Sequence, residues 1–145
     1  HPEVFQEVVA WGHRIGNHTF NHIQGIHYST ADYMANVEKA AQWIPSDLFR
    51  PPHGHLMPAQ TRALRQRYQV IMWDVVTRDY NARLTPEQVF GHVRKYVRDG
   101  SIIVFHDSLK SEKNLRVALS QSIEWLLGQG YQFKTLYSYS LKRIV

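Results

Sequence analysis

The 145-residue sequence contains no cysteine. Disulfide bonds, thiolate metal ligands and a cysteine nucleophile are therefore excluded. Exported and cytoplasmic proteins can both lack cysteine, so its absence does not indicate a compartment. The sequence also has no apolar run near the roughly 18 residues that a membrane-spanning helix needs. Its opening residues do not resemble a signal peptide, and no transmembrane segment is expected.

Blocks of like charge are absent as well. The net charge of +5 comes from basic residues that are scattered along the chain, without an aromatic–basic motif. This distribution does not favour a nucleic-acid partner. Apolar residues make up 43% of the chain, which is ordinary for a globular protein and sufficient at this length for a buried core. We expect residues 1–145 to form one domain.

Short apolar runs alternate with amphipathic segments along the whole sequence. Helices are expected where Pro, Ser or Thr precedes a helical pattern, and strands where a short apolar run lies between helices. Strict alternation predicts an α/β fold with parallel strands. The apolar run at 69–76 is interpreted as one strand buried on both faces. The predicted helices are 2–11, 28–44, 58–68, 85–100 and 114–130, and the predicted strands are 13–18, 47–50, 69–76, 101–107 and 131–136.

Polar side chains follow four successive predicted strands. In a parallel β/α array, residues that perform chemistry gather at the C-terminal ends of the strands. Any one of these residues alone could be an ordinary hydrogen-bonded side chain, but four strands in succession favour a site. The residues are His18 and His22, Arg50 and His53, Asp74 and Asp79, and His106 and Asp107.

The segment GNHTFNH places His18 and His22 four residues apart. Neutral imidazole is a common ligand of zinc, nickel, cobalt and iron. A catalytic metal centre usually has a third protein ligand and an open position for water. The sequence has no HExxH segment, so the usual zincin arrangement is excluded. The two histidines indicate a partial metal site.

Four motifs together resemble those of the polysaccharide deacetylase family, the NodB-homology domain of carbohydrate esterase family 4. They are HTFNH (18–22), RPPHG (50–54), TRDY (77–80) and VFH (104–106), and they occur in the family's order. The lead-in GHRIGNHTFNH also matches, and the resemblance covers essentially the whole chain. It implies a distorted (β/α) barrel of parallel strands.

The resemblance implies metal-dependent hydrolytic deacetylation of an N-acetylated or O-acetylated polysaccharide. Such an enzyme is a hydrolase acting on carbon–nitrogen (amide) bonds other than peptide bonds, and its partner is an acetylated glycan. Peptidoglycan, chitooligosaccharide and xylan stay open as substrates. One divalent ion is implied, with zinc the first choice and cobalt, nickel or iron open. Family analogy alone suggests an extracytoplasmic or cell-envelope location.

By the same resemblance, five residues have catalytic or metal-binding roles. His18 and His22 would be the metal ligands. Arg50 would orient the catalytic carboxylate. His106, paired with Asp79, would protonate the leaving amine, which is otherwise a poor leaving group.

Three further residues would contact the substrate. The backbone N–H of His53 would help to hold the oxyanion, as donors in an oxyanion hole do. Tyr80 and Val104 would line the pocket for the acetyl methyl group. Both depart from the family pattern, because Tyr80 replaces a Trp and Val104 replaces a Leu.

The family's Thr-Phe-Asp-Asp motif, which supplies the base and the third metal ligand, has no counterpart here. No Asp precedes Asp32, and the only acids before His18 are Glu3 and Glu7. We therefore expect the N-terminal strands to be missing, the barrel to be incomplete and the chain alone to be inactive. A missing N-terminal segment or a second chain would complete the barrel. The alternatives are a catalytically degenerate carbohydrate-binding relative and a purely structural fragment.

Overall fold

The computed structural model describes residues 1–136. The chain divides into two compact units, His1–Met72 and Trp73–Lys134. Each unit combines helices with one short parallel sheet, so the predicted α/β class is confirmed. The α-helices are α1 (Pro2–Ala10), α2 (Thr30–Ala41), α3 (Pro58–Leu64), α4 (Pro86–Tyr96) and α5 (Glu112–Gly128), and the strands are β1 (Leu48–Phe49), β2 (Gln69–Val70), β3 (Val75–Val76) and β4 (Ile103–Val104).

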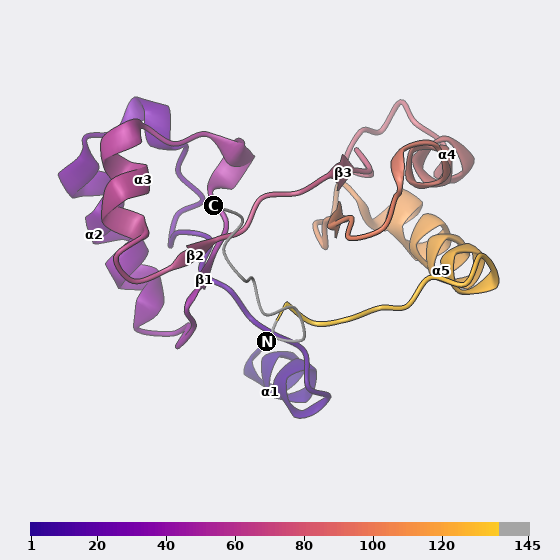
Figure 1. The fold of residues 1–145 in the computed structure, drawn as a ribbon, viewed down its shortest axis with the longest axis horizontal. Helices are drawn as coiled ribbons and strands as arrows, with labels where there is room; N and C mark the ends of the chain where they lie inside the picture. The colour runs from indigo at the N-terminus through magenta and orange to yellow at the C-terminus, as the bar shows by residue number, and fades with distance from the viewer. Residues whose placement is uncertain (137–145) are drawn as a thin grey trace. The chain divides into compact units, whose positions relative to one another are not determined.

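In the first unit, β1 pairs in parallel with β2, and helices α2 and α3 lie side by side (Figure 1). Helix α2 begins two residues after the predicted start, because the Ser29 hydroxyl caps it by accepting a hydrogen bond from the Asp32 N–H, and it ends three residues early. The core of this unit is Tyr33, Val37, Phe49, Leu64 and Tyr68.

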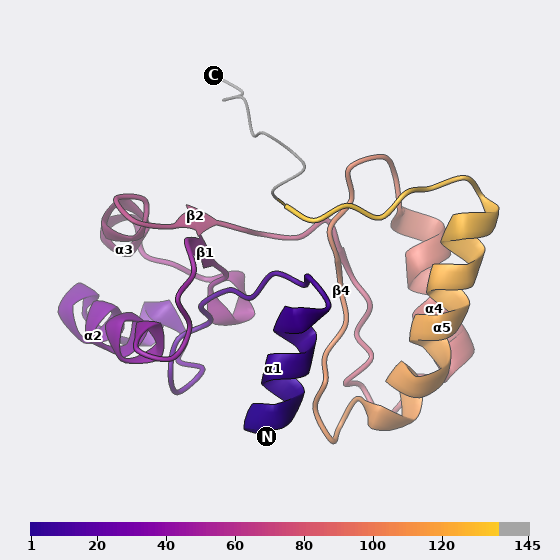
Figure 2. The same ribbon diagram turned by 90° about the horizontal axis from the view of Figure 1, so that it is seen from below.

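In the second unit, β3 pairs in parallel with β4, and α4 and α5 run alongside each other in both views (Figures 1 and 2). A capping box between Thr85 and Gln88 begins α4, as Thr85 and the proline after it predict. Val89 and Val93 of α4 are buried, and so are Ala118 and Leu126 of α5. These side chains form the interior of the unit.

The prediction of one strand over residues 69–76 is wrong. Its first part, β2, pairs with β1, while its last part, β3, pairs with β4 in a different sheet. Between them Met72 is exposed, and the Asp74 side chain binds Arg98 and Ser101. A continuous apolar run indicates burial but not which strand it pairs with.

Other predicted boundaries also shift. Residues 13–18 contribute only an isolated parallel bridge from Asn17 to Phe49, and residues 131–136 form no strand. Helix α3 ends at Leu64 and α4 at Tyr96, both four residues early, while α5 begins at Glu112. Within residues 1–136, no helix has the length and hydropathy that a membrane crossing requires.

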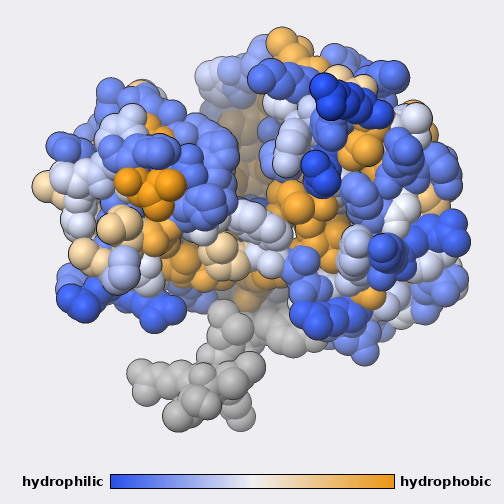
Figure 3. Space-filling view, turned by 90° about the horizontal axis from the view of Figure 1, so that it is seen from above, coloured by the Kyte–Doolittle hydropathy of each residue, from blue (hydrophilic) through white to orange (hydrophobic). Residues whose placement is uncertain are grey.

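Some apolar side chains remain on the surface. Figure 3 shows orange apolar areas among hydrophilic residues on the face in view. Across the described chain, Trp11, Trp43 and Leu109 are the most exposed of the large hydrophobic residues. Helix α1 buries none of its side chains.

Candidate active site

His18 is held in one tautomer. Its Nδ1 lies 2.6 Å from the backbone oxygen of Arg50. A carbonyl oxygen can only accept, so the hydrogen of the neutral ring is on Nδ1 and the Nε2 lone pair is free. Metal-binding histidines show the same arrangement, with the non-ligating nitrogen donating to a carbonyl or carboxylate.

The electrostatics of His18 favour the neutral ring. Burial lowers the pKa of His18, the hydrogen bond to Arg50 opposes this, and the charges of His22, Arg50 and His53 lower the pKa further. Desolvation is the largest of these effects because it disfavours the charged imidazolium. His18 is therefore uncharged at neutral pH, which is the form that can bind a cation.

His22 is in contact with two other imidazoles. Its ring centroid lies 4.9 Å from that of His18 and 5.1 Å from that of His53, both in edge-to-face geometry. Even so, residues 1–136 contain no group of three His, Cys, Asp or Glu side chains arranged to hold a metal ion. His18 and His22 thus fit a cation as part of a ligand set.

Asn17 supports the loop that carries these histidines. Its side chain is fully buried, its Nδ2 donates to the Val37 oxygen at 3.0 Å, and its Oδ1 accepts from the Thr19 N–H at 3.0 Å. Asn36, on α2, accepts from two further N–H groups of the loop, those of Phe20 and Asn21, at 2.9 and 3.0 Å. The loop between the two histidines is therefore fixed by side-chain amides.

The backbone of the HTFNH and RPPHG motifs has an unusual conformation. Thr19, His22 and His53 have φ values of 63°, 54° and 57°, in the left-handed region that disfavours side chains other than glycine. Arg78, immediately before Asp79, has a φ of 59°. Such conformations cost of order 1–3 kcal/mol each and persist only where surrounding contacts hold them.

Arg50 follows β1 and is partly buried. Its Nε donates to the Ile71 oxygen at 3.3 Å, and burial lowers its pKa. Among residues 1–136, none of the ion pairs involves Arg50. The guanidinium therefore lacks, within the described chain, the carboxylate that it is predicted to orient.

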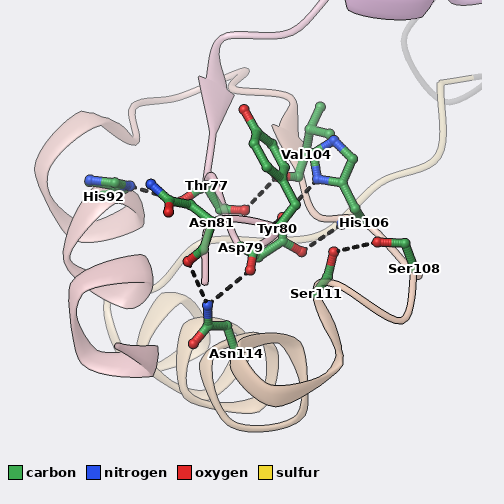
Figure 4. A network of polar contacts seen from close by, with 10 residues as sticks. All are labelled: Thr77, Asp79, Tyr80, Asn81, His92, Val104, His106, Ser108, Ser111 and Asn114. Atoms are coloured by element: carbon green, nitrogen blue, oxygen red, sulfur yellow. Dashed lines mark hydrogen bonds and ion pairs between the residues drawn. The ribbon is translucent and has the colours of Figure 1, made fainter. Parts of the chain in front are cut away.

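Asp79 and His106 form the predicted pair in the second unit (Figure 4). The Asp79 side chain is fully buried; its Oδ1 accepts from His106 Nδ1 and its Oδ2 from the His106 backbone N–H, both at 2.7 Å. A carboxylate only accepts, so Nδ1 of His106 bears a hydrogen. The His106 side chain is 38% exposed, and its Nε2 is left for other partners.

The remaining predicted residues lie around this pair. The Tyr80 ring meets the His106 ring edge-on, with centroids 4.9 Å apart. Val104, two residues before His106, is partly buried, and its carbonyl accepts from the Thr77 hydroxyl at 2.9 Å. The prediction that Asp74 lies at the C-terminal end of a strand is wrong, because it precedes β3 and pairs with Arg98.

The structure brings the predicted residues together in two sets. His18, His22, Arg50 and His53 are associated in the first unit, and Asp79, Tyr80, Val104 and His106 in the second. Convergence of both sets around one cleft stays a prediction.

Four supporting residues were not predicted from the sequence. Asn17 and Asn36 bind the histidine loop, while His92 and Asn114 bind backbone oxygens of the loop at 77–81. Apart from the Thr19 N–H next to Asn17, their partners are main-chain groups far away in sequence, so no local pattern marks them.

Comparisons with known proteins place these residues in context. A sequence profile described as polysaccharide deacetylase matches residues 1–73. A peptidoglycan-N-acetylglucosamine deacetylase of Bacillus cereus is 30% identical over 143 residues, which cover 93% of this chain and 67% of that protein. The chain spans between 29% and 54% of several other curated relatives.

Solved structures show the same fold. A crystal structure of a peptidoglycan N-acetylglucosamine deacetylase matches with a TM-score of 0.78 at 24% identity, covering 94% of this chain and 67% of that one. A pseudoenzyme of carbohydrate esterase family 4 from Bacillus anthracis matches with a TM-score of 0.75 at 22% identity, covering 91% and 48%.

Proposed function

Because the chain belongs to the polysaccharide deacetylase family, we propose that it carries the metal-binding and proton-donating groups of an enzyme that removes acetyl groups from a cell-wall glycan. The observation that carries the proposal is shared by His18 and His106: an acceptor holds Nδ1–H of each ring and leaves Nε2 available. The similarity to a peptidoglycan deacetylase favours N-acetylglucosamine of peptidoglycan as the substrate and the cell envelope as the location.

We assign His18 and His22 as ligands of one divalent cation, zinc before cobalt, nickel or iron. The neutral state of His18 and the contact between the two rings support this assignment. A bound divalent ion supplies Lewis acidity and lowers the pKa of water at the site. We assign the oxyanion role to the backbone N–H of His53, which lies in η2 (Pro52–Gly54).

His106 is assigned as the general acid. When doubly protonated, the ring keeps its Nδ1–H on the buried Asp79 carboxylate and gives the Nε2 proton to the leaving nitrogen as the C–N bond breaks. Asp79 fixes the direction of the ring through its hydrogen bond to Nδ1, as the acid of a hydrolase triad does. Tyr80 meets the ring edge-on and Val104 precedes His106 by two residues; both would enclose the acetyl methyl group.

The base is proposed to come from outside residues 1–145. Arg50 has no acidic partner in the described chain, and no third metal-binding side chain accompanies His18 and His22 there. A preceding segment of the protein or a second chain would bring the carboxylate that Arg50 orients, together with the strands that complete a barrel. Without it, the 145 residues are expected to release no acetate.

The second candidate is a carbohydrate-binding relative without catalysis. Its support is the same incomplete ligand set, together with the pseudoenzyme among the proteins of this fold. The retained Asp79–His106 pair favours the enzyme, because a binding protein has no use for a proton donor held in one tautomer.

The test measures metal content and acetate release on peptidoglycan and chitooligosaccharide. The protein is assayed as residues 1–145 and as a longer chain extended upstream by an Asp-containing segment. We expect His22→Ala to lose the metal, and His106→Ala to keep it while losing turnover. His27→Ala, an exposed histidine outside both sets, is the matched control.

Equal loss of metal in the His22 and His106 variants would make His106 a ligand and overturn the assignment. Glycan binding without acetate release in the extended protein would favour the second candidate. Equal activity in the short and extended proteins would place the base within residues 1–145.

A further inference from the structure

Asn114, near the start of α5, contacts the loop that carries Asp79. Its side chain is 2% exposed, and its Nδ2 donates to the backbone oxygens of Asp79 at 2.9 Å and Asn81 at 3.4 Å (Figure 4). Both partners are acceptors, so the amide can face the loop only with its nitrogen. Its buried Oδ1 has no hydrogen-bond partner within the described residues, so the donor end is the one the fold uses.

The Asp79 oxygen that Asn114 binds belongs to the same peptide unit as the Tyr80 N–H. That N–H donates to Asp79 Oδ1 at 3.1 Å, and the same Oδ1 accepts from His106 Nδ1 at 2.7 Å. A peptide unit is planar, with its C=O and N–H on opposite sides. When Asn114 binds the Asp79 backbone oxygen, it therefore also fixes the direction in which the Tyr80 N–H meets the carboxylate.

A main-chain turn also encloses this peptide, because the Asn81 N–H donates to the Arg78 oxygen at 2.9 Å. The Thr77 hydroxyl donates to the Val104 oxygen, and the Thr77 oxygen accepts from His92 Nδ1. Both contacts lie before Arg78, whose backbone is left-handed. After Arg78 the chain has no strand pairing until it reaches α4. Asn114 is the side chain that binds the backbone of Asp79 itself.

We propose that Asn114 is a positioning residue for the Asp79–His106 pair: by binding the 79–80 peptide, it sets the carboxylate so that Nδ1–H of His106 is held and Nε2 faces the substrate. The proposal rests on the proposed deacetylase function for its catalytic consequence. The competing account is that Asn114 only adds stability as a buried, hydrogen-bonded amide.

The variants are Asn114→Leu, which keeps most of the volume but has no donor, and Asn114→Asp, which keeps the shape but presents oxygens to two carbonyls. Ser122→Ala is the matched control. Ser122 lies on the same helix, is 1% exposed and donates to the Ala118 oxygen at 2.6 Å, away from the loop. It tests the loss of a buried hydrogen bond on α5 by itself.

Nitrogen-15 NMR of the His106 ring reports its tautomer without any need for activity. We expect the Nδ1–H form to dominate in the parent protein and the Ser122 variant, and to lose its preference in both Asn114 variants. In the extended protein, kcat for acetate release should fall roughly tenfold to a hundredfold, as displacement of a catalytic group does, with KM little changed.

An unchanged tautomer, with kcat falling no more than in Ser122→Ala, would reduce Asn114 to a structural residue and overturn the proposal. If the extended protein without substitutions releases no acetate but the Asn114 variants still lose the Nδ1–H preference, the positioning role stands and the proposed function fails. The two hypotheses are thereby tested separately.

Discussion

Replacing Asn17 by Ala tests whether the buried amide holds the histidine loop. The change removes the hydrogen bond to the Val37 oxygen and the acceptor for the Thr19 N–H. The Val37 oxygen lies within α2, so that loss costs the net value of one hydrogen bond, about 1 kcal/mol. The Thr19 N–H loses its acceptor, which costs about 1–3 kcal/mol if the group stays out of water.

The unfolding free energy should therefore fall by about 2–4 kcal/mol if the loop keeps its shape. The left-handed Thr19 offers a second outcome, because the loop can relax and recover part of the roughly 1–3 kcal/mol stored in that conformation. Relaxation would move His18 and His22 apart. A small loss of stability should then come with a loss of roughly 10–100-fold in zinc affinity, as for other residues that support ligands.

Urea unfolding with linear extrapolation measures the unfolding free energy, and zinc titration calorimetry on the same samples measures the zinc affinity. Asn21→Ala is the control, because it removes an exposed amide from the same loop while the Asn21 N–H keeps its bond to Asn36. If Asn17→Ala matches this control in both measurements, the loop does not depend on the amide and the reasoning is wrong.

The remaining predictions concern the buried Tyr33 and two glycines, Gly25 and Gly91, that differ in the space around them. Burial raises the pKa of Tyr33 to about 12, so the folded protein keeps this proton longer than the unfolded chain; the stability is complete below about pH 10, the unfolded value, and falls as pH rises toward 12. Tyr33→Phe should lessen this alkaline loss in urea unfolding, and equal pH slopes in both proteins would contradict the assignment. Gly25→Ala should destabilise by about 1–3 kcal/mol, because its Cβ would strike Gln60 Oε1 and the His55 backbone oxygen. Gly91→Ala on α4 meets nothing within 4 Å and should stabilise by up to about 1 kcal/mol, so thermal melting shifts of the same sign would refute the packing argument.

The helices could be predicted because their signals are local. Ser29 and Thr85 are within three residues of the N–H groups that they cap, so a short window of sequence contains both partners. The strand at 69–76 could not be predicted correctly, since its division depends on pairing with β1 and β4. Hydrophobic periodicity indicates which side chains are buried, but it does not indicate which strand is the pairing partner.

In the candidate site as well, some residues are marked by local sequence motifs and others are brought in only by the fold. The spacing of His18 and His22 and the motif positions of Asp79 and His106 are visible in the sequence. In the structure the two rings of the first pair are in contact, and the second pair is hydrogen-bonded. Asn114 was invisible, because its partners are backbone oxygens more than 30 residues away. Any polar residue on a helix could make such contacts, and only the fold selects one.

The left-handed backbone at Thr19, His22, His53 and Arg78 limits how this protein could be engineered for thermostability. Replacement by Gly would relax each position and raise melting temperature, and screening for heat resistance would select such changes. Each of these residues is a predicted site residue or a direct neighbour of one. The stabilised variants would then lose ligand geometry, so a stability–activity trade-off is built into the backbone of the motifs themselves.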